Sequence, residues 1–69
     1  MKVIVNGKET NVSENPTVNE VLAELKVKMP DMVTVELNGA ILDRKTFDDT
    51  RIHPGDRMEF LYFMGGGGR

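Results

Sequence analysis

The stretch Thr17-Val18-Asn19-Glu20-Val21-Leu22-Ala23-Glu24-Leu25 decides the fold, because its helical periodicity stands between segments with the patterns of strands. Its apolar residues recur at i, i+3, i+4 and i+7, as Val18, Val21, Leu22 and Leu25. Thr17 and Glu20 have the spacing of a capping box at the start. The sequence therefore predicts an amphipathic helix of about two and a half turns. It must end before Pro30, because the residue before a proline disfavours helical geometry.

Two strands are predicted before this helix. β-Branched residues fill the segment 3–5, and Asn6-Gly7 follows it. Asn-Gly is the strongest short signal for a hairpin, because both residues tolerate the positive φ of a type I′ turn. A second strand, roughly residues 8–12, is expected to pair back on the first.

Three further strands are predicted after the helix. Residues 33–37 alternate apolar and polar, with Val33, Val35 and Leu37 facing inward, and Asn38-Gly39 repeats the turn signal before a short strand at 40–42. Residues 43–52 read as a polar connection with one helical turn near 46–49. Pro54-Gly55 fits a type II turn. The last strand is expected at 57–64, with Met58, Phe60 and Tyr62 on one face.

This order of elements predicts an α+β domain, with one main helix packed on one face of a mixed sheet of about five strands. It leaves room for the final strand to lie centrally beside the first, which is the ubiquitin-like β-grasp arrangement. We expect residues 1–64 to form this domain and residues 65–69 to form a flexible glycine-rich tail.

Composition excludes several classes of protein. A chain of 69 residues holds one small domain, and without cysteine it has no disulfide or thiol chemistry. Nine Lys and Arg against eleven Asp and Glu, spread without runs, argue against nucleic-acid binding. The longest apolar run, residues 60–64, is too short to span a membrane, and the amino terminus lacks the apolar stretch expected of a signal peptide. A cytoplasmic location is therefore expected.

Candidates for catalysis or metal binding are few. His53 lies in a turn with no cysteine or nearby serine to pair with, so we expect it to be solvated. The spacing of Asp43, Asp48 and Asp49 matches no calcium loop. The methionines at 29, 32, 58 and 64 are expected to fill gaps in the core. We therefore predict no catalytic residue, no metal site and no bound cofactor.

The carboxy-terminal glycines are the informative feature. Gly65, Gly66, Gly67 and Gly68 follow the last strand, and fully extended they reach about 13 Å. Without Cβ atoms such a tail can enter a slot that other residues would obstruct, and so present its end to chemistry performed by another protein. The alternative is an ordinary solvated linker or an expression remnant.

When the glycine tail enters a narrow slot of another protein, its backbone becomes ordered, at a cost of about 1 to 2 kcal/mol per residue. Contacts between that protein and another part of this chain's surface must offset the cost. Ile4 is expected near Leu61 and Phe63 if the first and last strands are neighbours, giving an apolar patch for a partner. Burying about 200 Å² there would contribute near 5 kcal/mol. The alternative is that these three residues are core covered by a loop.

The chain as a whole resembles the ThiS family of sulfur carriers in thiamine biosynthesis and, more distantly, the MoaD family of molybdopterin carriers. The matching stretches are Val5-Asn6-Gly7-Lys8, residues 17–25, Val35-Glu36-Leu37-Asn38-Gly39, Pro54-Gly55-Asp56-Arg57 and residues 63–68. The resemblance implies that Gly67 and Gly68 are the family's terminal pair. An E1-like adenylyltransferase would use ATP to adenylate the glycine carboxylate, which becomes a thiocarboxylate. The sulfur would pass to thiazole synthase or another acceptor, with the carrier as co-substrate and not enzyme.

Arg69 departs from this pattern, because carriers of this kind end in glycine. We expect Arg69 to be removed before activation. Two other functions stay open: a ubiquitin-like interaction module or modifier, and a carrier that serves molybdenum or tungsten cofactor or amino-acid synthesis. The small patch suggests a monomer that docks transiently.

Overall fold

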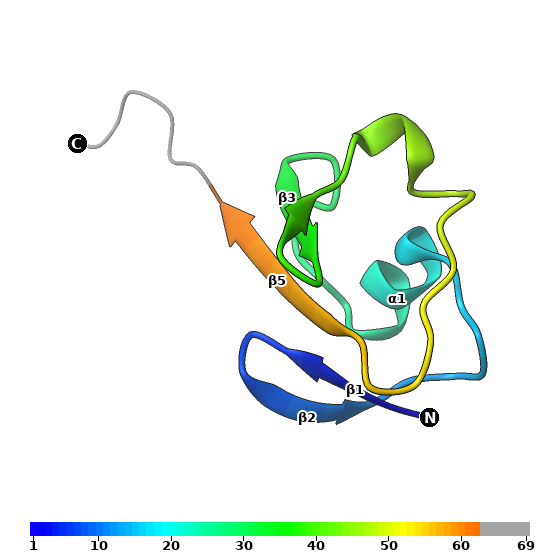
Figure 1. Cartoon of the computed structure of the whole chain (residues 1–69). Helices are drawn as coiled ribbons and strands as arrows, with labels where there is room; N and C mark the ends of the chain where they lie inside the picture. Colours follow the sequence, from blue (N-terminus) through cyan, green and yellow to red (C-terminus); the bar gives the residue numbers. More distant parts are fainter. Residues whose placement is uncertain (63–69) are drawn as a thin grey trace.

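A five-stranded mixed sheet carries one α-helix on one of its faces in the computed structural model, which describes residues 1–62 (Figure 1). The elements are β1 (Lys2–Val5), β2 (Lys8–Asn11), α1 (Val18–Glu24), β3 (Val33–Leu37), β4 (Ala40–Ile41), η1 (Arg44–Thr46) and β5 (Arg57–Tyr62). The sheet order is β2-β1-β5-β3-β4. β5 is central, parallel to β1 and antiparallel to β3. The predicted α+β class and the place of the last strand beside the first are confirmed.

Both Asn-Gly hairpins form as predicted. Asn6 and Gly7 have φ of 50° and 83°, and Asn38 and Gly39 have φ of 52° and 90°. Positive φ at both central residues is the requirement of a type I′ turn, whose twist matches that of the flanking strands. Gly55 has φ of 83° and Asp56 N donates to His53 O at 3.1 Å, as the predicted Pro-Gly turn requires.

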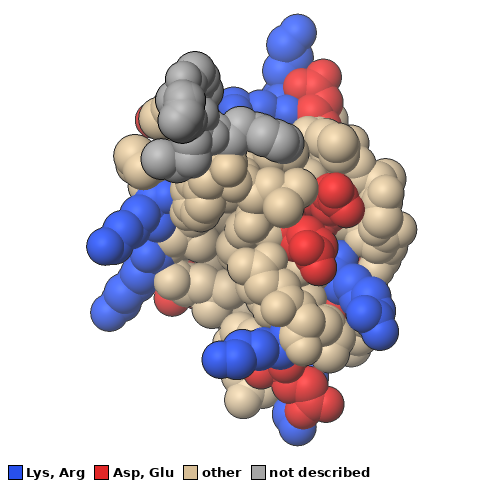
Figure 2. Space-filling model, turned by 90° about the vertical axis from the view of Figure 1, so that its left-hand side faces the viewer, with Lys and Arg blue, Asp and Glu red and all other residues tan. Residues whose placement is uncertain are grey.

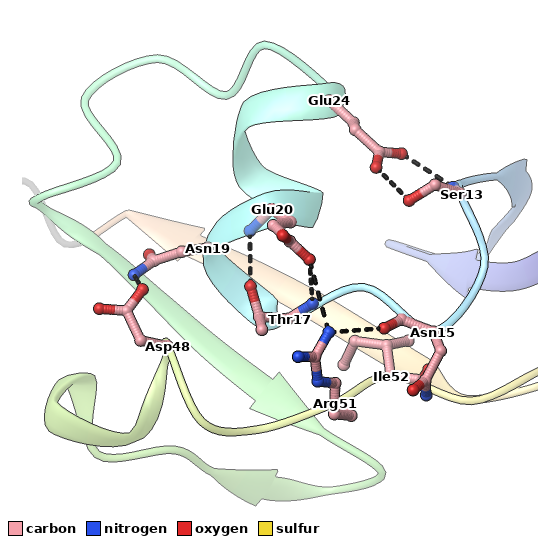
Figure 3. Close-up of polar contacts among 9 residues, drawn as sticks. All are labelled: Ser13, Asn15, Thr17, Asn19, Glu20, Glu24, Asp48, Arg51 and Ile52. Atoms are coloured by element: carbon pink, nitrogen blue, oxygen red, sulfur yellow. Dashed lines mark hydrogen bonds and ion pairs between the residues drawn. The ribbon is translucent and has the colours of Figure 1, made fainter.

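Helix α1 begins with the predicted capping box. Thr17 Oγ1 accepts a hydrogen bond from Glu20 N at 3.1 Å, and a Glu20 carboxylate oxygen accepts one from Thr17 N at 2.8 Å (Figure 3). The helix ends at Glu24, slightly shorter than predicted, and the chain turns away at Lys26, where φ is 55°. No helix among residues 1–62 has the length and apolarity needed to cross a membrane.

Polar contacts tie both ends of α1 to neighbouring loops (Figure 3). Arg51 donates to Asn15 O at 3.0 Å and lies 3.8 Å from the Glu20 carboxylate, so the β4–β5 connection is held at the start of the helix. At the other end the Glu24 carboxylate accepts hydrogen bonds from the hydroxyl and the backbone N–H of Ser13. Both hydrogen bonds lower the pKa of Glu24 below its ordinary value, and the bond from the Ser13 hydroxyl has the larger effect.

The β4–β5 connection contributes more to the core than its polar sequence predicts. Its helical turn, η1, starts earlier than the expected 46–49, because the Asp43 side chain caps it by accepting from Lys45 N at 3.0 Å. This turn places Phe47, 2% exposed, against the core, and Ile52 is fully buried. The core lies between α1, this connection and the inward face of the sheet, with buried side chains Val3, Val12, Val18, Val21, Leu22, Val33, Val35, Phe47, Ile52 and Met58.

Candidate functional site

Strand β5 leads the chain towards the glycine run, and it is held firmly where its described part ends. Val33 of β3 is in register with Tyr62. The Tyr62 hydroxyl donates to Lys28 O at 2.8 Å, which links this end of the strand to the loop after α1. The predicted functional residues Phe63, Gly65, Gly66, Gly67, Gly68 and Arg69 lie outside the described residues.

Two asparagines from the hairpin turns support β5 from either side. Asn6 Oδ1 accepts a hydrogen bond from Phe60 N at 2.8 Å. Asn38 Oδ1 accepts from Arg57 N at 2.9 Å, and its Nδ2 donates to Asp56 Oδ1 at 3.1 Å. Each asparagine thus adopts the positive φ of its turn, and its side chain also accepts a hydrogen bond from a backbone N–H of the central strand.

Replacing Asn38 by alanine is expected to destabilise the domain by about 1 to 3 kcal/mol, because Arg57 N loses its acceptor and alanine is disfavoured at positive φ. Asn38→Gly separates the two causes, since glycine accepts that φ freely. Urea unfolding should place Asn38→Gly between the wild type and Asn38→Ala. Equal stability of Asn38→Gly and the wild type would show that the side-chain hydrogen bonds contribute nothing.

The sheet face opposite α1 is not covered by any element among residues 1–62, and we call it the open face (Figure 1). Strand alternation assigns its residues, because Val3, Val35 and Met58 are buried on the helix side. The open face consists of Lys2, Ile4, Glu9, Asn11, Thr34, Glu36, Ile41, Arg57, Glu59 and Leu61. Figure 2 views the molecule from this side and shows a broad uncharged surface with a group of acidic residues near its middle.

Ile4 and Leu61 share the open face but are farther apart than expected. Ile4 pairs with Arg57, and Leu61 lies four residues later on β5. At about 3.3 Å per residue this is a separation of roughly 13 Å along the strand. Arg57 and Glu59 lie on the same face between Ile4 and Leu61, so charged side chains separate these two members of the expected apolar patch. Both apolar side chains are half-buried, and the residues described do not place a loop over them.

Ile41 is an open-face residue that sequence analysis did not single out. It is 66% exposed and lies directly opposite Glu36 across β3 and β4. The expectation that the methionines fill the core holds for Met58 but is wrong for Met29 and Met32, which are 61% and 63% exposed. Those two lie in the loop between α1 and β3, and Met64 lies outside the described residues.

A shallow hollow of about 230 Å³ lies on the open face, where the two hairpin turns approach β5. Gly7 and Gly39 line it from the turns, and Ile4, Glu36, Arg57, Met58 and Glu59 line it from the strands. A Cβ added at either glycine would meet no heavy atom within 4 Å. The hollow is therefore an open contact surface for another molecule and not an enclosed pocket for a small ligand.

Three of the residues weighed as chemical candidates make structural contacts. His53 is exposed in its turn, with Nδ1 3.9 Å from the Asp56 carboxylate. Asp43 caps η1, and Asp48 accepts a hydrogen bond from Asn19 Nδ2 at 2.6 Å. Within residues 1–62, no group of three or more His, Cys, Asp or Glu side chains is placed to hold a metal ion.

Comparison with known proteins identifies the fold family. The model of the ThiS family matches residues 2–67. The chain belongs to the ThiS family. The resemblance to ThiS-like sulfur carriers seen in the sequence is thus confirmed, and the match extends through Gly67.

Two solved structures agree with ThiS membership. A crystal structure of the thiamine biosynthesis protein ThiS from Geobacter metallireducens is 52% identical, covers 97% of this chain and 100% of that chain, and has a TM-score of 0.90. A solution structure of a thiamine biosynthesis protein from the same organism is 51% identical, covers 100% of this chain and 91% of that chain, and has a TM-score of 0.79. The β-grasp arrangement of this ThiS-like chain is therefore shared with close relatives.

Two curated relatives carry a ThiS-like region within a longer protein. A thiazole synthase from Paramagnetospirillum magneticum is 37% identical over 67 residues, and one from Magnetococcus marinus is 33% identical over 67 residues. Each alignment covers 97% of this chain but 20% of the relative. The chain thus spans about a fifth of the length of these relatives.

Proposed function

We propose that this ThiS-family chain carries sulfur as a thiocarboxylate on Gly68 and donates it for the thiazole of thiamine. The observation that carries the proposal is the family match through Gly67 on a fold whose central strand leads towards the glycine run. The relatives support the choice of pathway, since two are thiazole synthases and two are thiamine biosynthesis proteins.

The proposed chemistry needs an activating partner. The Gly68 carboxylate attacks the α-phosphate of ATP on an E1-like adenylyltransferase, and pyrophosphate leaves. A sulfide-level sulfur source then attacks the acyl carbon, AMP departs with one carboxylate oxygen, and a thiocarboxylate remains. A glycine carbonyl leaves that attack unhindered, because it has no side chain. ATP is thus the partner's substrate, and we expect the reactions to take place in the cytoplasm.

The carrier's own contribution is to position its end. β5 is held up to Tyr62 by the hydrogen bonds of the Tyr62 hydroxyl and the Asn6 side chain, and the glycine run follows it in the sequence. The open face offers the partner a surface beside that strand. Positioning of this kind reduces the entropy that must be lost when the end reaches the reacting atoms.

Mass spectrometry tests the proposal directly. The chain ending at Gly68 is incubated with an E1-like adenylyltransferase, magnesium-ATP and sulfide, and its intact mass is measured. We expect a gain of about 16 Da, because sulfur replaces one carboxylate oxygen. The reaction without ATP serves as control and should leave the mass unchanged. A chain that never gains this mass would be a ubiquitin-like interaction module instead of a sulfur donor.

A further inference from the structure

The described end of strand β5 is supported by a neighbouring strand on one side only. Leu61 and Tyr62 are in register with residues of β3. On the other side the pairing with β1 ends at Met58, and the Asn6 side chain reaches only as far as Phe60 N. A strand end with such partial support opens easily. The last two described residues therefore depend on contacts outside the sheet to stay in place.

The part of the loop that receives the Tyr62 hydroxyl lies outside the hydrophobic core. Tyr62 donates to Lys28 O at 2.8 Å, and residues 28–32 around this carbonyl are all exposed. Lys26 and Met29 adopt φ of 55° and 53°, a conformation that costs energy in residues other than glycine. Polar contacts must therefore hold the loop in shape and keep the acceptor of Tyr62 in its place.

Arg44 supplies such contacts from the β4–β5 connection. Its Nη1 donates to Pro30 O at 2.8 Å and its Nη2 to Val33 O at 2.6 Å, so one planar guanidinium joins the loop to the first residue of β3. Val33 is the residue in register with Tyr62. The guanidinium also lies 5.1 Å from the centroid of the buried Phe47 ring. Arg44 thus connects the core to the loop and the strand that hold Tyr62.

We propose that Arg44 is a remote positioning residue for activation of the glycine carboxylate, acting through the loop and the Tyr62 hydroxyl. The inference rests on the proposed function. We call the two hydrogen bonds of Arg44 and the one of the Tyr62 hydroxyl the brace. Without the brace, Leu61 and Tyr62 join the segment whose backbone must be ordered when the carboxylate reaches the reacting atoms. A smaller share of docked carriers then has its end correctly placed.

The kinetics of the mass-gain reaction, with the chain that ends at Gly68, test this role. Tyr62→Phe removes only the hydroxyl, and Arg44→Lys keeps the charge but lacks the planar fork that joins two carbonyls. We expect each variant to lower kcat about three- to tenfold, with the KM for the carrier changed by less than about twofold. A purely structural defect has the opposite signature. Unfolded carrier lowers the concentration of competent substrate, which raises the apparent KM and preserves kcat at saturation.

The double variant Tyr62→Phe/Arg44→Lys separates a shared route from two independent effects. Since either change alone breaks the brace, the double variant should lose about as much kcat as the more impaired single variant. Losses that multiply would overturn the proposal. Arg51→Lys is the matched control, because Arg51 also joins two loops, by donating to Asn15 O at the start of α1 (Figure 3). It should leave kcat unchanged, and an equal loss of kcat there would refute a specific role for Arg44.

Amide hydrogen exchange provides a readout that needs no partner. Met32 N donates to Met29 O at 2.9 Å in the same loop. This N–H should exchange several-fold faster in Tyr62→Phe and in Arg44→Lys, and at the wild-type rate in Arg51→Lys. Unchanged exchange in the first two variants would refute the brace.

The outcomes distinguish this inference from the function on which it rests. A wild-type chain that gains no mass would refute the proposed function and this inference with it. A wild-type chain that gains mass, together with unchanged kcat in Tyr62→Phe and Arg44→Lys, would reject this inference alone. The expected loss of kcat without a rise in KM would establish the brace as part of the activation step.

Discussion

A chain that ends at Gly68 should gain about 16 Da in the activation reaction, whereas the chain that keeps Arg69 should retain its original mass. The reason is steric and electrostatic. A slot wide enough only for a glycine backbone excludes a long cationic side chain next to the reacting carboxylate. Arg69 also moves the free carboxylate one residue beyond Gly68, the glycine proposed to carry the sulfur. We therefore expect the chain that ends at Gly68 to gain the mass and the chain that keeps Arg69 to show no gain at all.

Arg69→Gly is the matched variant for this experiment, because it keeps the length of the chain and removes the side chain. We expect it to gain mass, which would identify the side chain as the obstacle. Protein purified from its native host provides the second measurement. Thiocarboxylated material that still carries Arg69 would contradict the requirement for its removal.

The turns of this fold were predictable because their chemistry is local. Asn6-Gly7 and Asn38-Gly39 adopt positive φ wherever they join two strands, so the sequence alone indicates the hairpins. The capping box of Thr17 and Glu20 is equally local. The second role of Asn6 and Asn38, as acceptors for β5, depends on residues far along the chain. No local pattern could show it.

The positions of several surface residues could not be predicted, because they depend on the register between strands and on the path of a loop. The parallel pairing of Ile4 with Arg57 sets the distance to Leu61, and alternation within each strand cannot give an offset between strands. Met29 and Met32 were expected in the core on hydrophobicity, but the chain turns at Lys26 and leaves both in an exposed loop. Glu36 and Glu59 had no signal at all, because only the register makes them neighbours.

Phe47→Ala is expected to unfold most of the protein at 25 °C. Truncating a buried phenylalanine costs about 3 to 5 kcal/mol, and a single core of this size contributes about 3 to 5 kcal/mol in total. Phe47 is among the largest fully buried side chains, and the guanidinium of Arg44 lies 5.1 Å from its ring centroid. The lost ring would therefore remove both core packing and a cation–π contact.

Circular dichroism and urea unfolding measure this effect, with Phe47→Leu as the variant that keeps an apolar side chain and stays foldable enough for a midpoint. Met32→Ala is the control, because it truncates a large hydrophobic residue that is 63% exposed, and it should change stability by less than about 0.5 kcal/mol. A wild-type midpoint for Phe47→Ala would mean that the β4–β5 connection merely covers the core. The expected loss of stability would instead show that this connection, although polar in most of its sequence, is an essential part of the hydrophobic core.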